Sequence, residues 1–497
     1  MVKISEIVNQ NPWWKEGKEF VRFEKKFKAA PIFFARKDIH FQKGNIYILR
    51  GPRQIGKTTY IKNSIKKLLE KNIPARSILY LSADFFISRR ELRNAIEYFV
   101  DSSRDLPEIY IFLDEITSLD DWNLELKFIA DQGIAQKATV LATGSSAVKL
   151  KEKGELLPGR GLEGNEYLLK PLAFREFARQ SSGFLSQHLP PDAFQSGLIN
   201  LGLILEESFP SFSGNPEETR PALEKLLPFK KELAFLFQLY VATGGFPGVI
   251  NHYFQNRFIA KTGKINPEIA EIFVRDVLGD LARLQKQETV ARQILKALLD
   301  RYGSRYSFSS LSREIEKPHL TTITYLDHLE DSFISFVLYA YDFNKNSIKA
   351  KGDKKVYFFD PFILHSIKSF LSGKEIWEVI GQTLESEELL GRIIEGIVVS
   401  HLLLSREIPW QRTGSTFLWS YYDKSGKEID AVFNAGDEYF GIEIKYRSQA
   451  GEGKRKSIPA IKKYFLLSKE EFGKKGETTV VPVEIFLALL FPSERNL

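Results

Sequence analysis

Short apolar runs alternate with amphipathic helical patterns over the first third of the chain. Four of these runs predict strands, and they cover residues 46–49, 77–81, 109–113 and 138–143; the last two are typical of strands buried on both faces. Between them, apolar residues recur at helical spacing, for example at Ile61, Ile65 and Leu68. Strands that alternate with helices predict a parallel α/β sheet. We assign this domain to residues 1–180, including an aromatic and basic amphipathic lead-in over residues 1–40.

The pattern changes after residue 180. Residues 181–220 are rich in Ser, Pro, Gly and Phe, and we interpret them as an insertion or irregular lid. Helical patterns follow to about residue 284, so residues 181–285 are grouped as an insertion with a helical lid. Three further helical patterns then precede a strand-like stretch, and they cover residues 289–301, 307–316 and 319–334. This order predicts a winged helix-turn-helix module over residues 286–360.

The predicted winged-helix module carries candidates for nucleic-acid contact. Thr321, Thr322 and Tyr325 would lie on its third helix, where they could meet DNA or equally form a protein-binding face. The basic run KAKGDKK over residues 349–355 is interpreted as a solvated loop, with contact to a DNA backbone as the alternative. Residues 361–497 form a last block, in which a helical pattern precedes several strand patterns.

Composition narrows the class of protein. The chain has 497 residues, of which 43% are hydrophobic and 27% charged, and these values exclude a largely disordered, collagenous or purely coiled-coil protein. Its apolar runs fall well short of the roughly 20 residues that span a bilayer, and its start lacks a signal-peptide core. We therefore expect a soluble, cytoplasmic protein without a membrane partner. The absence of cysteine excludes disulfides and thiolate metal sites. The net charge of +7 permits nucleic-acid contact without demanding it.

Residues 51–58 read GPRQIGKT, which is the G-x-x-x-x-G-K-T pattern of a phosphate-binding loop between a strand and a helix. Gly51 and Gly56 let the backbone curl so that several N–H groups point at one phosphate. The helix that follows presents its positive end to the same phosphate. Lys57 can reach the β- and γ-phosphates, and Thr58 offers a hydroxyl to Mg²⁺. The predicted ATP-binding residues are Gly51, Pro52, Arg53, Gln54, Ile55, Gly56, Lys57, Thr58 and Thr59.

Two acids follow the apolar run that ends at residue 113. In parallel α/β sheets, ligands bind at the carboxyl ends of the strands. Asp114 is therefore predicted to join the ATP site and to hold Mg²⁺ together with Thr58. Glu115 is predicted to polarise the attacking water as a general base. The alternative is an ordinary strand end with solvated acids, which the preceding phosphate-binding loop disfavours.

Two more polar residues are candidates for catalysis. Ser145 follows another apolar run and could hydrogen-bond the attacking water or the γ-phosphate. Arg160, in the sequence Gly-Arg-Gly, could stabilise the charge of the transition state. It would act within its own chain or across a subunit boundary, and the second case implies a homo-oligomer. A surface role for Arg160 is the alternative.

The order of the motifs resembles that of an archaeal and bacterial family of AAA-type ATPases with a C-terminal domain of unassigned function. The segments that carry this resemblance are GPRQIGKTT, LDEI, TGSS, LPGRG, KPLAFREF, YVATGGFP and KVYFFDPFIL. The phosphate-binding loop is common to many families, whereas PLAFREF combined with GGFP is more specific. The resemblance implies a nucleotide site formed by Lys57, Thr58, Asp114, Glu115, Ser145 and Arg160. It also implies a winged-helix region in the central part of the chain.

The last block resembles the core of PD-(D/E)xK nucleases, which predicts a restriction-endonuclease-like α/β domain over residues 361–497. The residues that carry this resemblance are Glu395, Asp430, Glu443 and Lys445. Alternation along a strand places Glu443 and Lys445 on one face. Such carboxylates hold a divalent metal, here a second Mg²⁺ or Mn²⁺, and the lysine can activate water for attack on a phosphodiester. The alternative is an ordinary amphipathic strand in a domain that has lost its activity.

These features predict an Mg²⁺-dependent ATPase that couples ATP hydrolysis to action on DNA, with endonuclease activity as a further option. The competing hypothesis is a nucleotide-switched regulatory or defence protein, in which the nuclease-like domain is an inactive binding platform.

Overall fold

The structure is a computed structural model that describes residues 4–22, 24, 27, 30–144, 165–207, 212, 214–283, 286–406, 417–436, 438–447, 458–491 and 497. The chain divides into two compact units, Met1–Lys170 with Arg495–Leu497 and Pro171–Glu494. Within the described ranges, no single helix has the length and apolar character to cross a bilayer. The segments Pro216–Thr243 and Pro247–Ile259 meet that criterion only as a pair bent by 112°.

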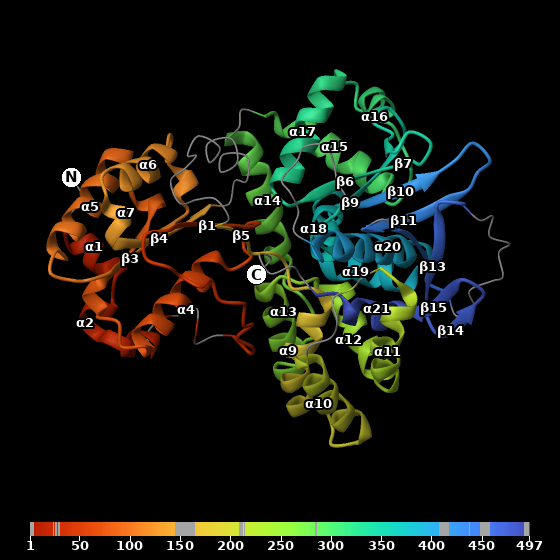
Figure 1. The fold of residues 1–497 in the computed structure, drawn as a ribbon, viewed down its shortest axis with the longest axis horizontal. Coiled ribbons are helices and arrows are strands. Elements are labelled where there is room, and N and C mark those ends of the chain that lie inside the picture. Colours follow the sequence, from red (N-terminus) through yellow and green to blue (C-terminus); the bar gives the residue numbers. More distant parts are fainter. Residues whose placement is uncertain are drawn as a thin grey trace. The chain divides into compact units, whose positions relative to one another are not determined.

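A parallel five-stranded sheet forms the centre of the first unit (Figure 1), in the order β2-β3-β4-β1-β5. Its strands are β1 (Ile46–Arg50), β2 (Ile78–Ser82), β3 (Ile109–Asp114), β4 (Ala138–Gly144) and β5 (Glu166–Leu168). Every residue of β1, β3 and β4 is buried. The prediction of a parallel α/β sheet with strands covered on both faces is therefore confirmed.

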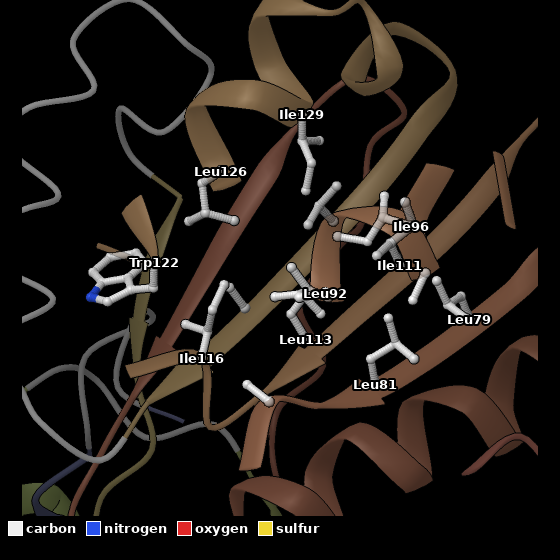
Figure 2. Close-up of a cluster of buried hydrophobic side chains, with 14 of the residues drawn as sticks. Leu79, Leu81, Leu92, Ile96, Ile111, Leu113, Ile116, Trp122, Leu126 and Ile129 are labelled. Carbon is white, nitrogen blue, oxygen red and sulfur yellow. The ribbon is translucent and has the colours of Figure 1, made fainter. Parts of the chain in front are cut away.

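Helices cover both faces of this sheet. In Figure 1, α4 (Lys57–Glu70) lies on one side of the sheet, and α5 (Arg89–Ser102) and α6 (Asn123–Asp131) lie on the other. The shorter helices of the unit are α1 (Ile4–Gln10), α2 (Trp13–Glu16) and α7 (Ile134–Lys137). Figure 2 shows Leu79, Leu81, Ile111 and Leu113 of the strands packed against Leu92, Ile96, Leu126 and Ile129 of α5 and α6. Burial of these side chains fixes the sheet and thereby the strand ends that form the site described below.

The amphipathic lead-in covers the open edge of the sheet at β2. The side-chain amide of Asn11 pairs with the backbone of Tyr80 in both directions, because Nδ2 donates to the carbonyl at 2.9 Å and Oδ1 accepts from the N–H at 2.7 Å. The indole N–H groups of Trp13 and Trp14 both donate to the Ile78 carbonyl, at 3.0 and 2.8 Å. These bonds satisfy backbone groups that an edge strand otherwise leaves unpaired.

The second unit begins with helices where irregular structure was predicted. Residues 181–220 contribute to α9 (Phe174–His188), α10 (Ala193–Glu206) and α11 (Pro216–Leu226), so the prediction of an irregular lid is wrong in its local structure. The polar residues mark helix starts. Asp192 caps α10 by accepting a bond from the Gln195 N–H at 2.9 Å, and Asn215 caps α11 by accepting from the Glu217 N–H at 3.1 Å. The helices α12 (Lys230–Thr243), α13 (Pro247–Phe254) and α14 (Pro267–Arg283) follow.

The middle of the second unit has the predicted order of helices and strands. The helices are α15 (Glu288–Asp300), α16 (Phe308–Glu314) and α17 (His319–Asp331). Four strands form antiparallel pairs, β6 (Ser335–Tyr339) with β9 (Lys354–Phe358) and β7 (Tyr341–Asp342) with β8 (Ser347–Ile348). Thr322 and Tyr325 of α17 are buried, and they bond to Ser312 and Gln287. The expectation that they form part of a contact surface is therefore corrected.

The basic run 349–355 turns several of its lysines inward. Lys349 donates to the Tyr422 carbonyl at 2.6 Å, and Lys354 donates to the carbonyls of Ala350 and Gly352 at 2.8 Å each. Lys354 and Lys355 are both buried. The interpretation as a solvated loop is wrong for these residues, because carbonyls and carboxylates of the chain satisfy the ammonium groups in place of water or phosphate.

The last part of the second unit combines helices with a six-stranded mixed sheet in the order β10-β11-β12-β13-β15-β14. Its helices are α18 (Pro361–Ser372), α19 (Ile376–Glu385), α20 (Glu387–Leu404) and α21 (Val483–Leu489). Its strands are β10 (Leu418–Tyr422), β11 (Glu428–Ala435), β12 (Glu438–Lys445), β13 (Ile461–Ser468), β14 (Gly473–Lys475) and β15 (Thr478–Pro482). The β12–β13 and β13–β15 pairs are parallel, and the other pairs are antiparallel.

Three of the segments that carry the family resemblance meet at Gly245. Its N–H donates to the buried carboxyl of Asp360 at 2.8 Å, and its carbonyl accepts from the Leu172 N–H at 2.8 Å. The Tyr240 hydroxyl donates to the Leu172 carbonyl at 2.8 Å. A Cβ atom on Gly245 would lie 2.2 Å from the carbonyl oxygen of Leu172 and 2.6 Å from its nitrogen. The close approach of two backbones therefore requires glycine here, and these motif residues have a structural role.

Replacement of Gly245 by alanine is expected to lower the free energy of unfolding by about 3 kcal/mol or more, because the methyl group overlaps backbone atoms that cannot turn aside. Chemical denaturation followed by tryptophan fluorescence measures this change. Gly248 is the matched control, since a Cβ atom there meets nothing within 4 Å. Gly248→Ala should leave the unfolding midpoint unchanged or slightly raised. Equal midpoints for Gly245→Ala and the wild type would contradict the packing argument.

Candidate functional site

The loop over residues 51–56 connects β1 to α4 and bends sharply. Gly56, which precedes the first residue of α4, has a φ of +101°, a conformation that side chains rarely adopt. A Cβ atom on Gly51 would lie 2.1 Å from the carbonyl oxygen of Leu169, so the loop approaches a neighbouring backbone too closely for any side chain. Both glycines of the predicted motif are therefore required by the geometry of the loop.

Lys57 turns back into this loop. Its Nζ atom donates to the carbonyl oxygens of Gly51 and Pro52, at 3.1 Å each, and the side chain is only 4% exposed. The carboxylate of Glu115 lies 3.7 Å from the same Nζ. The loop thus holds the buried Lys57 ammonium at its centre.

Asp114, the last residue of β3, joins three neighbouring elements through its buried carboxylate. The Thr58 hydroxyl, from α4, donates to Oδ2 at 2.7 Å, and the Tyr80 hydroxyl, from β2, donates to the same oxygen at 2.9 Å. The Thr143 hydroxyl, from β4, donates to Oδ1 at 2.6 Å. These bonds fix the orientation of the carboxylate at the carboxyl end of the sheet.

Glu115 follows Asp114 in a left-handed backbone conformation, with a φ of +50°. This conformation is uncommon outside glycine, and it ends the strand. The Glu115 N–H donates to the Thr143 hydroxyl at 3.1 Å, which holds the turn. The side chain is 26% exposed and contacts Lys57. Glu115 therefore stands beside the loop and remains accessible to water.

Tyr80 contributes a neutral hydroxyl to the group. Burial raises the pKa of Tyr80 above its usual value, and the Asp114 carboxylate raises it further. The hydroxyl therefore keeps its proton and donates a hydrogen bond to Asp114. The Lys62 ammonium of α4 lies 3.9 Å from the centre of the Tyr80 ring and 4.8 Å from that of Trp13. The Trp13 ring of the lead-in packs edge to face with the Tyr80 ring, with the two centres 6.4 Å apart.

The structure brings together four of the residues predicted for the nucleotide site, namely Lys57, Thr58, Asp114 and Glu115. Ser145 and Arg160 lie outside the described residues. Sequence reasoning missed Tyr80 and Thr143. A weak signal existed for Thr143, because it is a polar residue at the end of a buried strand next to β3. No local pattern distinguishes Tyr80 from the other aromatic residues of the sheet.

A second cluster of charges lies in the last part of the chain, around the ammonium of Lys355 on β9. Its Nζ lies 2.7 Å from Glu395 of α20, 2.9 Å from Glu428 and 3.3 Å from Asp430, the last two on β11. The structure thus brings Glu395 and Asp430 together, as predicted, but it does so around a lysine of the same chain.

The other two residues of the predicted nuclease group lie on β12, which pairs with β11 next to Asp430. Glu443 and Lys445, both on β12, lie 3.7 Å apart, which confirms that they share a face. Asp430 reaches β12 through its Oδ2 atom, which accepts from the Ile444 N–H at 2.9 Å. Among the described residues, no group of three or more His, Asp or Glu side chains has the arrangement of a metal site, and the three carboxylates around Lys355 converge on its ammonium. The acids predicted as metal ligands are therefore not assembled as one metal-binding group.

Charge interactions keep the Lys355 ammonium protonated. Burial disfavours the charged form, but Glu395, Asp430 and Glu428 outweigh it, so the pKa of Lys355 is raised. Burial and the neighbouring Asp430 carboxylate raise the pKa of Glu395 to about 7, against the opposing effect of Lys355. The Lys355 ammonium, on β9, is therefore a permanent cation beside the acids of α20 and β11.

Three family models match separate parts of the chain. Residues 43–178 match a model described as AAA domain. Residues 234–373 and 390–486 match two models described as domains of unknown function, DUF8612 and DUF4143. The first match contains the phosphate-binding loop and the strands β1, β3 and β4 of the site.

Similar proteins are distant in sequence. The chain is 24% identical over 469 residues to the uncharacterized protein MJ1637 of Methanocaldococcus jannaschii, and the alignment covers 91% of this chain and 87% of the relative. Among solved structures, it is similar to the replication initiator DnaA bound to AMPPCP and single-stranded DNA, at 17% identity and a TM-score of 0.24. That similarity covers 58% of this chain and 83% of DnaA.

A structure of katanin matches at 14% identity and a TM-score of 0.22, covering 41% of this chain and 68% of katanin. A parallel sheet whose first strand leads into the GPRQIGKT loop, within the region matched as an AAA domain, identifies residues 43–178 as a P-loop domain of AAA type.

Proposed function

We propose that the first unit binds ATP with Mg²⁺ and hydrolyses it. The observation that carries this proposal is the connected group of Lys57, Thr58, Asp114 and Glu115 at the carboxyl end of a parallel sheet. Lys57 would exchange its bonds to the Gly51 and Pro52 carbonyls for bonds to the β- and γ-phosphates. The N–H groups of the loop and of the start of α4, over residues 51–59, would bind the phosphate oxygens.

The oxygen atoms beside the loop fit a magnesium ion. Mg²⁺ prefers hard oxygen donors, and the Thr58 hydroxyl and the Asp114 carboxylate lie 2.7 Å apart at the start of α4. These two residues would hold the ion together with the phosphates of ATP. When bound, Mg²⁺ supplies positive charge that offsets the charge of the phosphate oxygens. Tyr80 and Thr143 would keep Asp114 oriented toward it.

Glu115 is proposed as the residue that activates water. Its carboxylate lies beside Lys57, and therefore beside the place of the γ-phosphate. It would accept a proton from the water that attacks the γ-phosphorus, while the bond from that phosphorus to the β,γ-bridging oxygen breaks. Ser145 and Arg160 are proposed to assist, Ser145 at the water or γ-phosphate and Arg160 at the transition-state charge, within the chain or across a homo-oligomer.

We further propose that ATP hydrolysis acts on DNA through the second unit. Support comes from the order of α15, α16, α17, β6 and β9, which is that of a winged helix over residues 286–360, and from the net charge of +7. On this proposal residues 1–180 are the ATPase domain and residues 181–285 a helical insertion. Residues 361–497 form a nuclease-like domain that could cut DNA with Glu395, Asp430, Glu443 and Lys445.

A specific observation favours the second candidate function, in which the nuclease-like domain is an inactive binding platform in a nucleotide-switched protein. Lys355 contacts two of the acids predicted as metal ligands, Glu395 and Asp430. A buried ammonium at this position neutralises the acids without a metal ion, and the hydrolysis of a phosphodiester by such a group requires the metal.

One preparation of the full chain tests both functions. ATP turnover with Mg²⁺ is measured with and without duplex or single-stranded DNA, and plasmid DNA is incubated in parallel with Mg²⁺ or Mn²⁺. We expect Mg²⁺-dependent phosphate release that DNA changes, and intact plasmid. No phosphate release under any condition would contradict the ATPase proposal. Plasmid cleavage by the wild type that is lost in Asp430→Asn would contradict the binding-platform function and support the nuclease function.

A further inference from the structure

The Lys355 cluster differs from an exposed ion-pair network in its burial. The Lys355 side chain is 3% exposed and that of Glu395 is 15% exposed. Each of the three carboxylates directs one oxygen at the same ammonium, within 3.3 Å. Removal of a charge of either sign from such a place leaves the remaining charges uncompensated.

The acids have further partners that fix their positions. The Tyr357 hydroxyl donates to the same Glu395 oxygen that contacts Lys355. Arg305 lies 3.2 Å from Glu428, and the backbone N–H of Ile444 donates to Asp430. The carboxylates are therefore held in place from several sides, and the ammonium lies at the point where they converge.

A divalent metal cannot take the position that this ammonium occupies among the three carboxylates. Carboxylate oxygens coordinate Mg²⁺ or Mn²⁺ at roughly 2.0–2.3 Å, so a shared ion would lie between the same oxygens that now contact Nζ. Two cations at that separation would repel each other strongly in a buried environment. The residues present thus do not fit the metal that the resemblance to nucleases implies.

We propose that Lys355 is the resident cation of this acid cluster and that the C-terminal domain functions without a divalent metal. The ammonium supplies the positive charge that a metal ion would otherwise supply. It lies on β9, in the segment that precedes the domain. It thereby joins β9 to α20 and β11 through charge. The inference extends the platform function and does not depend on the nucleotide site.

Thermal unfolding of the full chain with and without Mn²⁺, in the absence of ATP, tests the proposal. The wild type should unfold at the same temperature in both solutions. Lys355→Met should unfold at a lower temperature without metal, because three carboxylates lose their cation. Mn²⁺ should then raise its midpoint by several degrees, since the vacated position can bind the ion. In the Lys355→Met/Asp430→Asn variant, this rise should largely disappear.

Two controls keep the outcome decisive. Lys351→Met changes an exposed lysine of the same run and should behave like the wild type. If Lys355→Met does not fold alone, recovery of folding by Mn²⁺ supports the proposal, and failure to recover contradicts it. An Mn²⁺-induced rise in the wild type that is lost in Asp430→Asn would show that metal enters beside the lysine, and this result would overturn the inference.

Discussion

Replacement of Lys57 by alanine is expected to reduce ATP turnover by about 10³-fold or more, with weaker binding of ATP. The ammonium is the charge that the loop directs at the β- and γ-phosphates, and charge at these oxygens is what a phosphoryl-transfer site stabilises. Release of inorganic phosphate from purified protein, measured at saturating Mg-ATP, gives the loss of rate. Equilibrium binding of ATP gives the loss of affinity.

The matched control for this substitution is Lys66→Ala. Lys66 lies on the same helix, its side chain is 38% exposed, and it pairs with Glu70 away from the loop. We expect wild-type turnover for it. The thermal midpoint of Lys57→Ala should also be measured, because Lys57 bonds to two carbonyls of the loop. Normal phosphate release by folded Lys57→Ala would contradict the proposal that this loop forms the site of ATP hydrolysis.

The second large effect is expected for Glu115→Gln, which keeps the size of the side chain but removes its basicity. Turnover should fall by about 10²- to 10⁴-fold, the usual contribution of a general base, while ATP binding is retained. The predicted signature is therefore a low turnover number with little change in affinity. Single-turnover assays with prebound ATP distinguish loss of chemistry from loss of binding.

Glu97→Gln serves as the control for charge, since Glu97 is an exposed acid on α5 away from the loop. It should hydrolyse ATP as the wild type does. If Glu115→Gln turned over ATP at the wild-type rate, the general base would have to be another group. If it lost affinity for ATP as strongly as Lys57→Ala, Glu115 would act mainly in binding.

The part of the fold that could be predicted depends on local signals. The loop over residues 51–58 is one contiguous motif, and the strand that ends at Asp114 is a continuous apolar run, so each feature is specified by its immediate neighbours. Parallel pairing of adjacent strands then brings them to the same edge of the sheet. Lys57, Thr58 and Asp114 were accordingly found together.

Contacts between residues that are distant in sequence and belong to no recognisable motif could not be predicted. Asn11 and Tyr80 contact each other although they are 69 residues apart in the sequence. Tyr80 also contacts Asp114, which follows it by 34 residues. Lys355 reads as part of a basic surface run, yet it contacts Asp430, 75 residues later. The direction in which a strand lysine points is set by which elements pack on each face, and alternation along the strand does not specify this.

Residues 181–220 show a different source of error. Prolines and small polar residues favour turns, but the same residue types also begin helices. Pro216 is the first residue of α11, and Asn215 and Asp192 are capping residues. The prolines and small polar residues of this segment therefore indicate where helices begin, and they do not indicate that helices are absent.

A crystal structure with Mg²⁺ and a non-hydrolysable ATP analogue shows whether the loop and the side chains of Lys57, Thr58, Asp114 and Glu115 form the nucleotide site. We predict that the Lys57 ammonium contacts the β- and γ-phosphates, that Mg²⁺ lies between Thr58 and Asp114, and that Glu115 faces a water near the γ-phosphate. Nucleotide bound elsewhere, with Lys57 still bonded to the carbonyls of Gly51 and Pro52, would contradict the proposed nucleotide site.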